Sequence, residues 1–257
     1  MRSARSQSDV VGFVIVFGIV IVGLVSVSAF GLSALETTRD ATVAESAEFA
    51  MESVNADIES LYTGIAGSRT TELNVESGTL GVGDRTSMTV SVSGGRLSGT
   101  ETISRTFRPI VFSGDRTSVV AENTLLIRDQ GASGAAAIEG PLGTFSGERT
   151  VVPMVVTEPT AVESQTGGTL QVESIVTDAT GRVFTSGSSS SLDVTVELSG
   201  LPDNRATVWR RVLNERLAGV PSSRSPPCAT PSSDTVDCQF ETNTLVASVV
   251  TIQYDIR

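Results

Sequence analysis

The stretch that decides the fold is SQSDVVGFVIVFGIVIVGLVSVSAFGLSAL, residues 6–35. No charged side chain occurs in residues 10–35. As a helix that rises 1.5 Å per residue, this run is about 39 Å long, more than the roughly 30 Å of hydrocarbon in a bilayer. It is also longer than the roughly 7–15 apolar residues of a cleaved secretory signal. The stretch therefore predicts a permanent transmembrane helix over residues 7–35.

Charges on the two sides of this stretch predict its orientation. Arg2 and Arg5 lie in a short basic leader, residues 1–6, whereas Glu36, Arg39 and Asp40 follow the stretch. The excess of arginine on the N-terminal side predicts a cytoplasmic N-terminus. We therefore expect a single-pass protein of the cell membrane whose remaining residues are extracellular.

An amphipathic segment, residues 36–66, follows the apolar stretch without a break. Neither proline nor glycine occurs in residues 33–62, and Gly64 and Gly67 then predict a helix end. Apolar residues at steps of three and four predict a buried stripe: Val43, Ala47, Ala50, Met51, Val54, Ile58, Leu61 and Ile65. Phe49 lies off the stripe, and two interpretations stay open: an exposed aromatic without a role, or a contact to another copy.

Residues 67–257 predict a β-rich extracellular head, because the apolar period changes to two. Gly181 predicts a hairpin turn over residues 178–182, and residues 131–143 read as a flexible loop. One short helix is predicted over residues 202–219, capped by Asp203. The predicted strands are 102–112, 118–128, 150–157 and 169–177, together with those around Met88–Val92, Leu192–Leu198 and Val246–Ile256.

The predicted short helix carries several arginines: Arg205, Arg210, Arg211 and Arg216. They allow two interpretations. The arginines either form a basic patch that docks an acidic surface, or they form a solvated helix face with internal ion pairs.

The two cysteines, Cys228 and Cys238, are ten positions apart in a proline- and serine-rich loop. Outside the cell we expect them to form a disulfide, which stabilises by roughly 2–3 kcal/mol in the chain-entropy model. The chain has no histidine and no third cysteine, which argues against a zinc site.

Composition excludes several classes of function. The net charge is −11, all 18 basic residues are arginine, and histidine is absent. This acidic balance argues against a nucleic-acid partner. It is typical of proteins that stay soluble in high salt, although a genome that prefers arginine codons gives the same lysine-free composition. Without histidine or a recognisable catalytic motif, we expect no enzymatic activity and no cofactor.

Two stretches carry a resemblance to a known family: RSQSDVVGFVIVFGIVIVGL, residues 5–24, and FGLSALETTRDATVAESAEFAMESVNADIESL, residues 30–61. Residues 1–65 resemble the haloarchaeal type IV pilin-like membrane proteins. The resemblance implies a pilin-like α+β fold. In this fold a long N-terminal transmembrane and amphipathic helix precedes a mainly antiparallel β head with one short helix.

The resemblance also implies processing and assembly. In that family a prepilin-type peptidase cuts just before the apolar run, which corresponds here to the bond between Ser6 and Gln7. The cut creates an ammonium group at Gln7, and a neighbouring copy's Asp9 would pair with it, because an unpaired charge near hydrocarbon costs several kcal/mol. The alternative is that Asp9 is solvated by water and lipid headgroups.

The sequence therefore leads to two hypotheses about function. The first is a structural or adhesive subunit of the cell surface, without catalysis, that assembles with like subunits or other pilin-like proteins. The second is an anchored, stand-alone extracellular binding protein that does not assemble.

Overall fold

The computed structural model describes the backbone of residues 5–161, 164–187 and 190–257, with all side chains in these ranges except those of 5–11, 29–41 and 76. The chain consists of two compact units, Met1–Val43 and Ala44–Arg257. Helix α1, Arg5–Tyr62, begins in the first unit and ends in the second.

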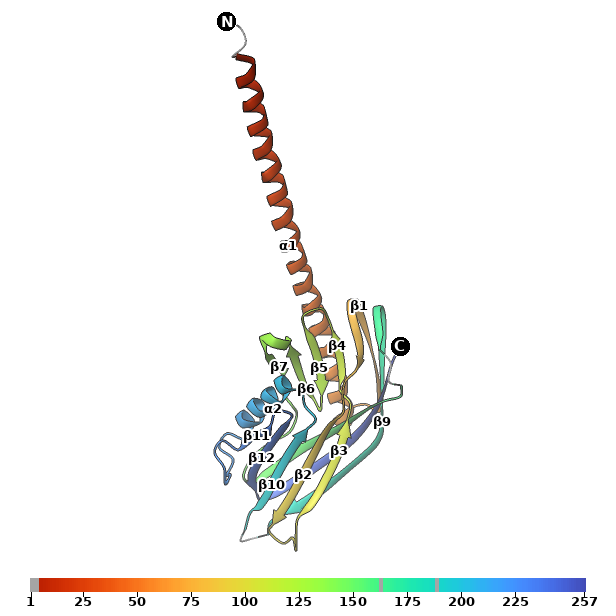
Figure 1. The fold of residues 1–257 in the computed structure, drawn as a ribbon. Helices are drawn as coiled ribbons and strands as arrows, with labels where there is room; N and C mark the ends of the chain where they lie inside the picture. The colour runs from red at the N-terminus through yellow and green to blue at the C-terminus, as the bar shows by residue number, and fades with distance from the viewer. Residues whose placement is uncertain (1–4, 162–163, 188–189) are drawn as a thin grey trace. The chain divides into compact units, whose positions relative to one another are not determined.

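Two β-sheets make up most of the second unit (Figure 1). The larger sheet has eight strands in the order β7-β6-β5-β4-β1-β9-β13-β8, and the smaller has five in the order β11-β12-β10-β2-β3. Every pairing is antiparallel except that of β13 with β8. The bounds are β1 Ser68–Val82, β2 Thr86–Gly94, β3 Glu101–Phe107, β4 Ile110–Ser113, β5 Ser118–Glu122, β6 Leu125–Asp129, β7 Ala135–Glu139, β8 Arg149–Pro159, β9 Gln165–Thr185, β10 Leu192–Ser199, β11 Cys228–Ser232, β12 Thr235–Thr242 and β13 Thr244–Ile256.

The main hydrophobic core contains residues from both sheets. Val90 and Val194 of the smaller sheet belong to the same buried cluster as Ile127 and Leu245 of the larger sheet. The alternation predicted for β2 and β10 is confirmed, because Met88, Val90 and Val92 are buried, as are Leu192, Val194, Val196 and Leu198. Strand alternation therefore supplies this core.

Helix α2, Asp203–Arg216, covers one side of this core. It contacts β6 and β7 of the larger sheet as well as β11 and β12 of the smaller one, and it lies beside them in Figure 1. Trp209 of α2 belongs to the core cluster. Because β7 and β11 are edge strands, the helix closes the apolar space between two sheet edges.

The part of α1 in the second unit, residues 44–62, covers the other face of the larger sheet. The predicted stripe is confirmed for Ala47, Met51, Val54, Ile58 and Leu61, which are all buried. Asp57 accepts a hydrogen bond of 2.5 Å from Thr71 of β1, and Glu48 is paired with Arg128 of β6. The prediction for Ile65 is wrong, since it lies past the helix end and is 76% exposed. Gly64 ends the helix with a φ of 75°.

Polar groups at the centre of this helix–sheet contact include two facing carboxylates. Asn55 is fully buried, and its Nδ2 donates to Glu139 Oε2 at 2.7 Å. Glu59 lies one turn further along α1. Partial burial, and secondarily the charge of Glu139, raise the pKa of Glu59 above its ordinary value of 4.5. The ionised form of Glu59 therefore destabilises the folded second unit.

Replacing Glu59 with glutamine should stabilise the second unit at pH 7 and not at pH 4. Because the folded-state pKa is raised, the wild type loses stability as pH rises from 4.5 through the folded value. The variant lacks this loss, and the gain should be on the scale of ~0.5 kcal/mol seen for exposed charge pairs. The midpoints of urea unfolding of E59Q and the wild type at the two pH values measure this gain in stability. The gain should be smaller when Glu139 is also replaced by glutamine, because Glu139 is one source of the raised pKa. An equal gain at pH 4 would contradict the assignment of the effect to ionised Glu59.

The predicted fold class, an α+β protein with a long N-terminal transmembrane helix, is wrong. The chain is mainly β, because the described residues after α1 form thirteen strands, several of them longer than the sequence patterns indicated. In the part of the chain that the structure describes, no helix meets the length and hydropathy needed to cross a membrane.

Several predicted boundaries within the head are also wrong. Residues 178–182 form no turn: they are part of β9, where Gly181 pairs with Ser248 of β13. A long ladder with β13 satisfies the backbone there and outweighs the local turn preference. The predicted loop at 131–143 contains β7. The predicted strands 102–112 and 118–128 are each two strands, and the latter turns at Asn123 and Thr124, which both have positive φ.

Candidate functional site

The residues predicted to direct processing lie in the first unit. Ser6, Gln7 and Asp9 belong to α1, and their side chains lie outside the described residues. Cleavage between Ser6 and Gln7, and the pairing of Asp9 with a new N-terminus, stay predictions.

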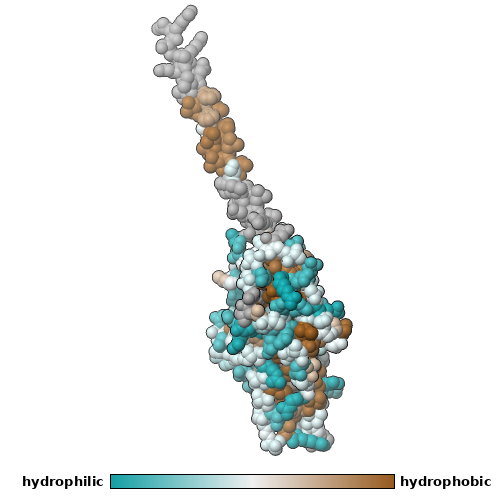
Figure 2. Space-filling view, turned by 90° about the vertical axis from the view of Figure 1, so that its right-hand side faces the viewer, coloured by the Kyte–Doolittle hydropathy of each residue, from teal (hydrophilic) through white to brown (hydrophobic). Residues whose placement is uncertain are grey.

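Residues 12–28 of α1 present apolar side chains on all sides of the helix. Phe13 is 70% exposed, Ile19 67% and Val27 73%, and Figure 2 shows a hydrophobic surface over this segment. The hydroxyl of Ser26 donates to the carbonyl of Val22 at 2.8 Å, so the polar group is satisfied within the helix. A helix that is apolar all round needs an apolar environment. This segment is the strongest candidate for a contact outside the chain.

Phe49 lies on α1 within the second unit and is 63% exposed. Its position off the buried stripe agrees with the sequence pattern. Ser53 donates to the carbonyl of Phe49, one turn earlier in α1, at 3.1 Å. A contact of Phe49 with another copy stays a prediction.

Cys228 and Cys238 form the expected disulfide. They are directly opposite one another in β11 and β12, with a Cα–Cα distance of 4.0 Å, and both are buried. Asn214 of α2 binds the Cys228 backbone twice, at 2.9 Å to N–H and 3.3 Å to the carbonyl. The disulfide therefore links the edge strand β11 to β12 at the point where α2 is attached.

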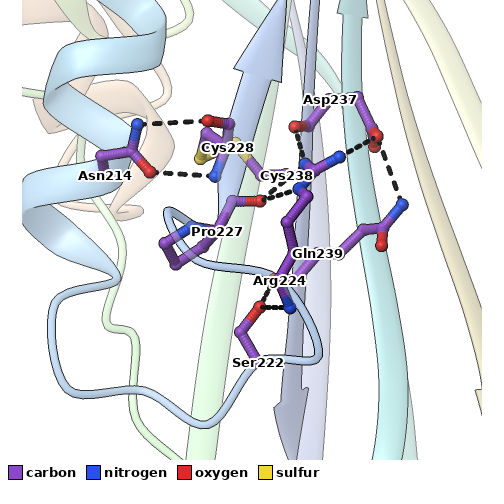
Figure 3. A network of polar contacts seen from close by, with 8 residues as sticks. All are labelled: Asn214, Ser222, Arg224, Pro227, Cys228, Asp237, Cys238 and Gln239. Carbon is purple, nitrogen blue, oxygen red and sulfur yellow. Dashed lines mark hydrogen bonds and ion pairs between the residues drawn. A yellow bond between two sulfur atoms is a disulfide. The ribbon is translucent and has the colours of Figure 1, made fainter.

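A polar network beside the disulfide holds the preceding loop (Figure 3). Arg224 donates to Asp237 Oδ2 at 2.9 Å and to the carbonyl of Pro227 at 2.6 Å from Nη2. Ser222 donates to the carbonyl of Gln239 at 2.6 Å. Asp237 is a residue of strand β12 and is paired with Arg224. Arg224, Ser222 and Oδ2 of Asp237 are engaged within the protein, which assigns the network to structure.

The most deeply buried charged group is Glu122 at the end of β5. Arg205 Nη1 donates to one carboxylate oxygen at 2.7 Å, and Trp209 Nε1 donates to the other at 2.6 Å. Burial raises the pKa of Glu122, and the charge of Arg205 opposes that change. Because both oxygens are occupied and the side chain has no exposed surface, the group has no access to a substrate.

The pairing of Arg205 corrects the interpretation of the arginines on α2. Arg205 is buried and does not belong to a solvated or docking face. Arg205 and Trp209 are four residues apart, so they share one face of the helix. An arginine four residues before the only tryptophan is a signal that the sequence contained, but its partner, Glu122, is 83 residues away.

A polar groove lies where three loops meet at one end of the two sheets. It has a volume of about 720 Å³. It is lined by Arg96 of the β2–β3 turn, by Thr185 at the end of β9, by Ser186, Gly187, Ser190 and Ser191 of the β9–β10 connection, and by Asn243 and Thr244 where β12 turns into β13. In Figure 1 these turns lie at the lower end of the sheets.

Backbone contacts hold the groove in shape. Ser186 N–H donates to the carbonyl of Asn243 at 2.9 Å, which joins two of the loops. A side chain at Gly95, which has a φ of 60°, would come within 2.7 Å of the Ser186 backbone, so only glycine allows this close approach. Sequence reasoning missed the groove, because its residues come from three separate turns.

Metal chemistry finds no support in the described part of the chain, where no three His, Cys, Asp or Glu residues form a possible metal site.

Comparison with known proteins identifies a family. No curated protein and no solved structure matches the chain. Residues 5–255, which include α1, α2 and all but the last residue of β13, match a family described as "Family of unknown function (DUF7289)". The chain therefore belongs to the DUF7289 family.

Proposed function

We propose that this protein is a structural or adhesive subunit of the cell surface, without catalysis. It is located at the cell membrane with residues 44–257 facing the extracellular medium, and it assembles with like subunits or other pilin-like proteins. In this proposal a prepilin-type peptidase matures the chain at Gln7, as the sequence resemblance implies.

The observation that carries the proposal is the exposed apolar surface of residues 12–28. Twelve large apolar side chains of this segment are exposed on the free chain. At roughly 25 cal/mol per Å² of apolar surface, covering such a segment is strongly favourable. Packing against the same segment of other copies removes this surface from water on every side of the helix. A monomer in water would leave it uncovered.

One feature of the second unit supports a place outside the cell, since the disulfide between Cys228 and Cys238 is typical of oxidising compartments. The net charge of −11 of the whole chain keeps subunits apart except where apolar contacts hold them together.

A charge inside the apolar segment should abolish assembly. In the full-length chain in mild detergent, Val22→Arg should weaken self-association more than about 100-fold, because an unpaired buried charge costs several kcal/mol. Sedimentation velocity measures the loss of oligomers. The matched control is Val183→Arg: Val183 is 64% exposed on β9 and Val22 is 66% exposed. A wild type that is monomeric, or a V22R variant that still assembles, would contradict the proposal.

The second candidate function is a stand-alone binding protein, which the polar groove favours. The mature N-terminus separates the two candidates. Mass spectrometry of protein from the native cell surface should find Gln7 as the first residue if the chain is a processed subunit. A mature surface protein that begins at Met1 or Arg2 would favour the stand-alone protein.

A further inference from the structure

We propose that the polar groove at the tip of the head binds an anionic saccharide. This inference rests on the adhesive role proposed above and names the ligand class of that role. It depends on the groove's lining, its single cationic group and its preformed shape.

The lining of the groove selects a hydroxylated ligand. Thr185, Ser190, Ser191 and Thr244 supply hydroxyl groups, and Asn243 supplies an amide. Hydroxyls and amides both donate and accept hydrogen bonds, as do the hydroxyls of a sugar. No aromatic or large aliphatic side chain lines the groove, so an apolar ligand has nothing to contact. A volume of about 720 Å³ is in the range of small-molecule sites and accommodates an oligosaccharide segment.

The cationic group of the groove is Arg96. In the described parts of the chain it makes no ion pair, whereas Arg205 and Arg224 each bind a carboxylate. A β-carbon at position 187 would lie 2.8 Å from Nε of Arg96, so the loop at Gly187 passes directly beside the guanidinium group. A guanidinium binds carboxylate and sulfate groups through paired hydrogen bonds. Arg96 therefore favours a sugar with an acidic substituent over a neutral one.

Two acids close to the groove do not compete for Arg96. Asp193 lies beside Gly94, and Glu241 accepts a hydrogen bond of 2.8 Å from the Ser191 hydroxyl. Neither residue lines the groove.

The fold provides the groove before any ligand binds. Asn243 N–H donates to the carbonyl of Gly147 at 2.8 Å, and Thr244 N–H donates to that of Glu148 at 3.0 Å. The loop that precedes β8 thus braces the β12–β13 turn. A braced site loses little conformational entropy on binding. A single groove is open and offers no aromatic side chain for stacking, so it should bind a saccharide weakly. Tight attachment therefore requires many grooves on one assembly, because linked binding sites gain avidity.

Ligand-observed NMR titration of the full-length chain in detergent tests the inference, with trigalacturonate, its methyl ester and sodium sulfate as probes. The wild type should bind trigalacturonate about tenfold more tightly than the ester, which lacks the charge. Arg96→Gln should abolish this preference, and the control Arg211→Gln, on the exposed side of α2, should keep it. Ser190→Ala combined with Asn243→Ala should weaken both saccharides by a similar factor, since these side chains contact hydroxyls.

Three results would overturn the inference. The wild type would show no saturable binding of either saccharide, R96Q would still prefer trigalacturonate to its methyl ester, or sulfate would bind as tightly as trigalacturonate. Sedimentation of the same samples separates this inference from the proposed function. Chains that assemble without binding trigalacturonate contradict only the saccharide site, and chains that bind it as monomers contradict only assembly.

Discussion

Replacing Glu122 with alanine should lower the free energy of unfolding by about 3–5 kcal/mol. The reason is that the variant leaves Arg205 charged and 6% exposed with no carboxylate to bind. It also leaves Trp209 Nε1–H without its acceptor in the core between α2 and the sheets. Guanidinium unfolding of the full-length chain, followed by the fluorescence of the only tryptophan and by circular dichroism, measures the change.

The matched control for E122A is Glu101→Ala. Glu101 pairs with Arg182 at 3.1 Å, but both side chains are about half exposed. An exposed ion pair contributes roughly 0–1 kcal/mol, because water and salt screen both charges. The double variant Glu122→Leu/Arg205→Met should recover most of the stability, since it removes both charges together. A loss of 1 kcal/mol or less in E122A would show that Arg205 finds another partner.

The second large effect should come from the face of α1 that lies on the larger sheet. Ile58→Ala should cost about 2–5 kcal/mol, because Ile58 is only 2% exposed and its truncation leaves a cavity between helix and sheet. Phe49→Ala, on the same helix but 63% exposed, should change stability by no more than about 0.5 kcal/mol. Guanidinium midpoints of the two variants provide the comparison, and equal losses would mean that the helix packs in another orientation.

Phe49 then allows a separate test of its predicted contact. Phe49→Ser should leave the stability of the second unit unchanged. If Phe49 touches a neighbouring copy, the variant should weaken self-association in the sedimentation experiment described for V22R. Unchanged association would assign Phe49 to the exposed surface without a role in assembly.

Local patterns predicted much of this molecule. A step of three and four residues placed Met51, Val54 and Ile58 on the buried face of α1, and a step of two placed Val90 and Val194 in the core. These predictions succeeded because a side chain's direction follows from the period of its own helix or strand. The disulfide was predicted as well, since only two cysteines are available.

Patterns failed where the deciding partner is distant in sequence. Residues 178–182 have the composition of a turn, yet β13, about 70 residues later, pairs with them as a strand. The fold class was wrong for a related reason, because the strands proved longer than their apolar patterns and outweigh the helices in the chain. Nothing local indicated the groove, which combines turns from three positions in the chain.

By itself, the sequence determined the apolar segment at residues 12–28, the buried stripe of α1, the pairing of the cysteines and the absence of lysine and histidine. Only the tertiary structure decided that Glu122 binds Arg205 and Trp209, that β9 continues through Gly181, and that Arg96 faces a groove of hydroxyl groups. The physical reason is the range of the interactions. Periodicity and covalent pairing depend on neighbouring residues or on a unique partner, whereas buried ion pairs, ladders and grooves depend on which distant segments the folded chain brings together.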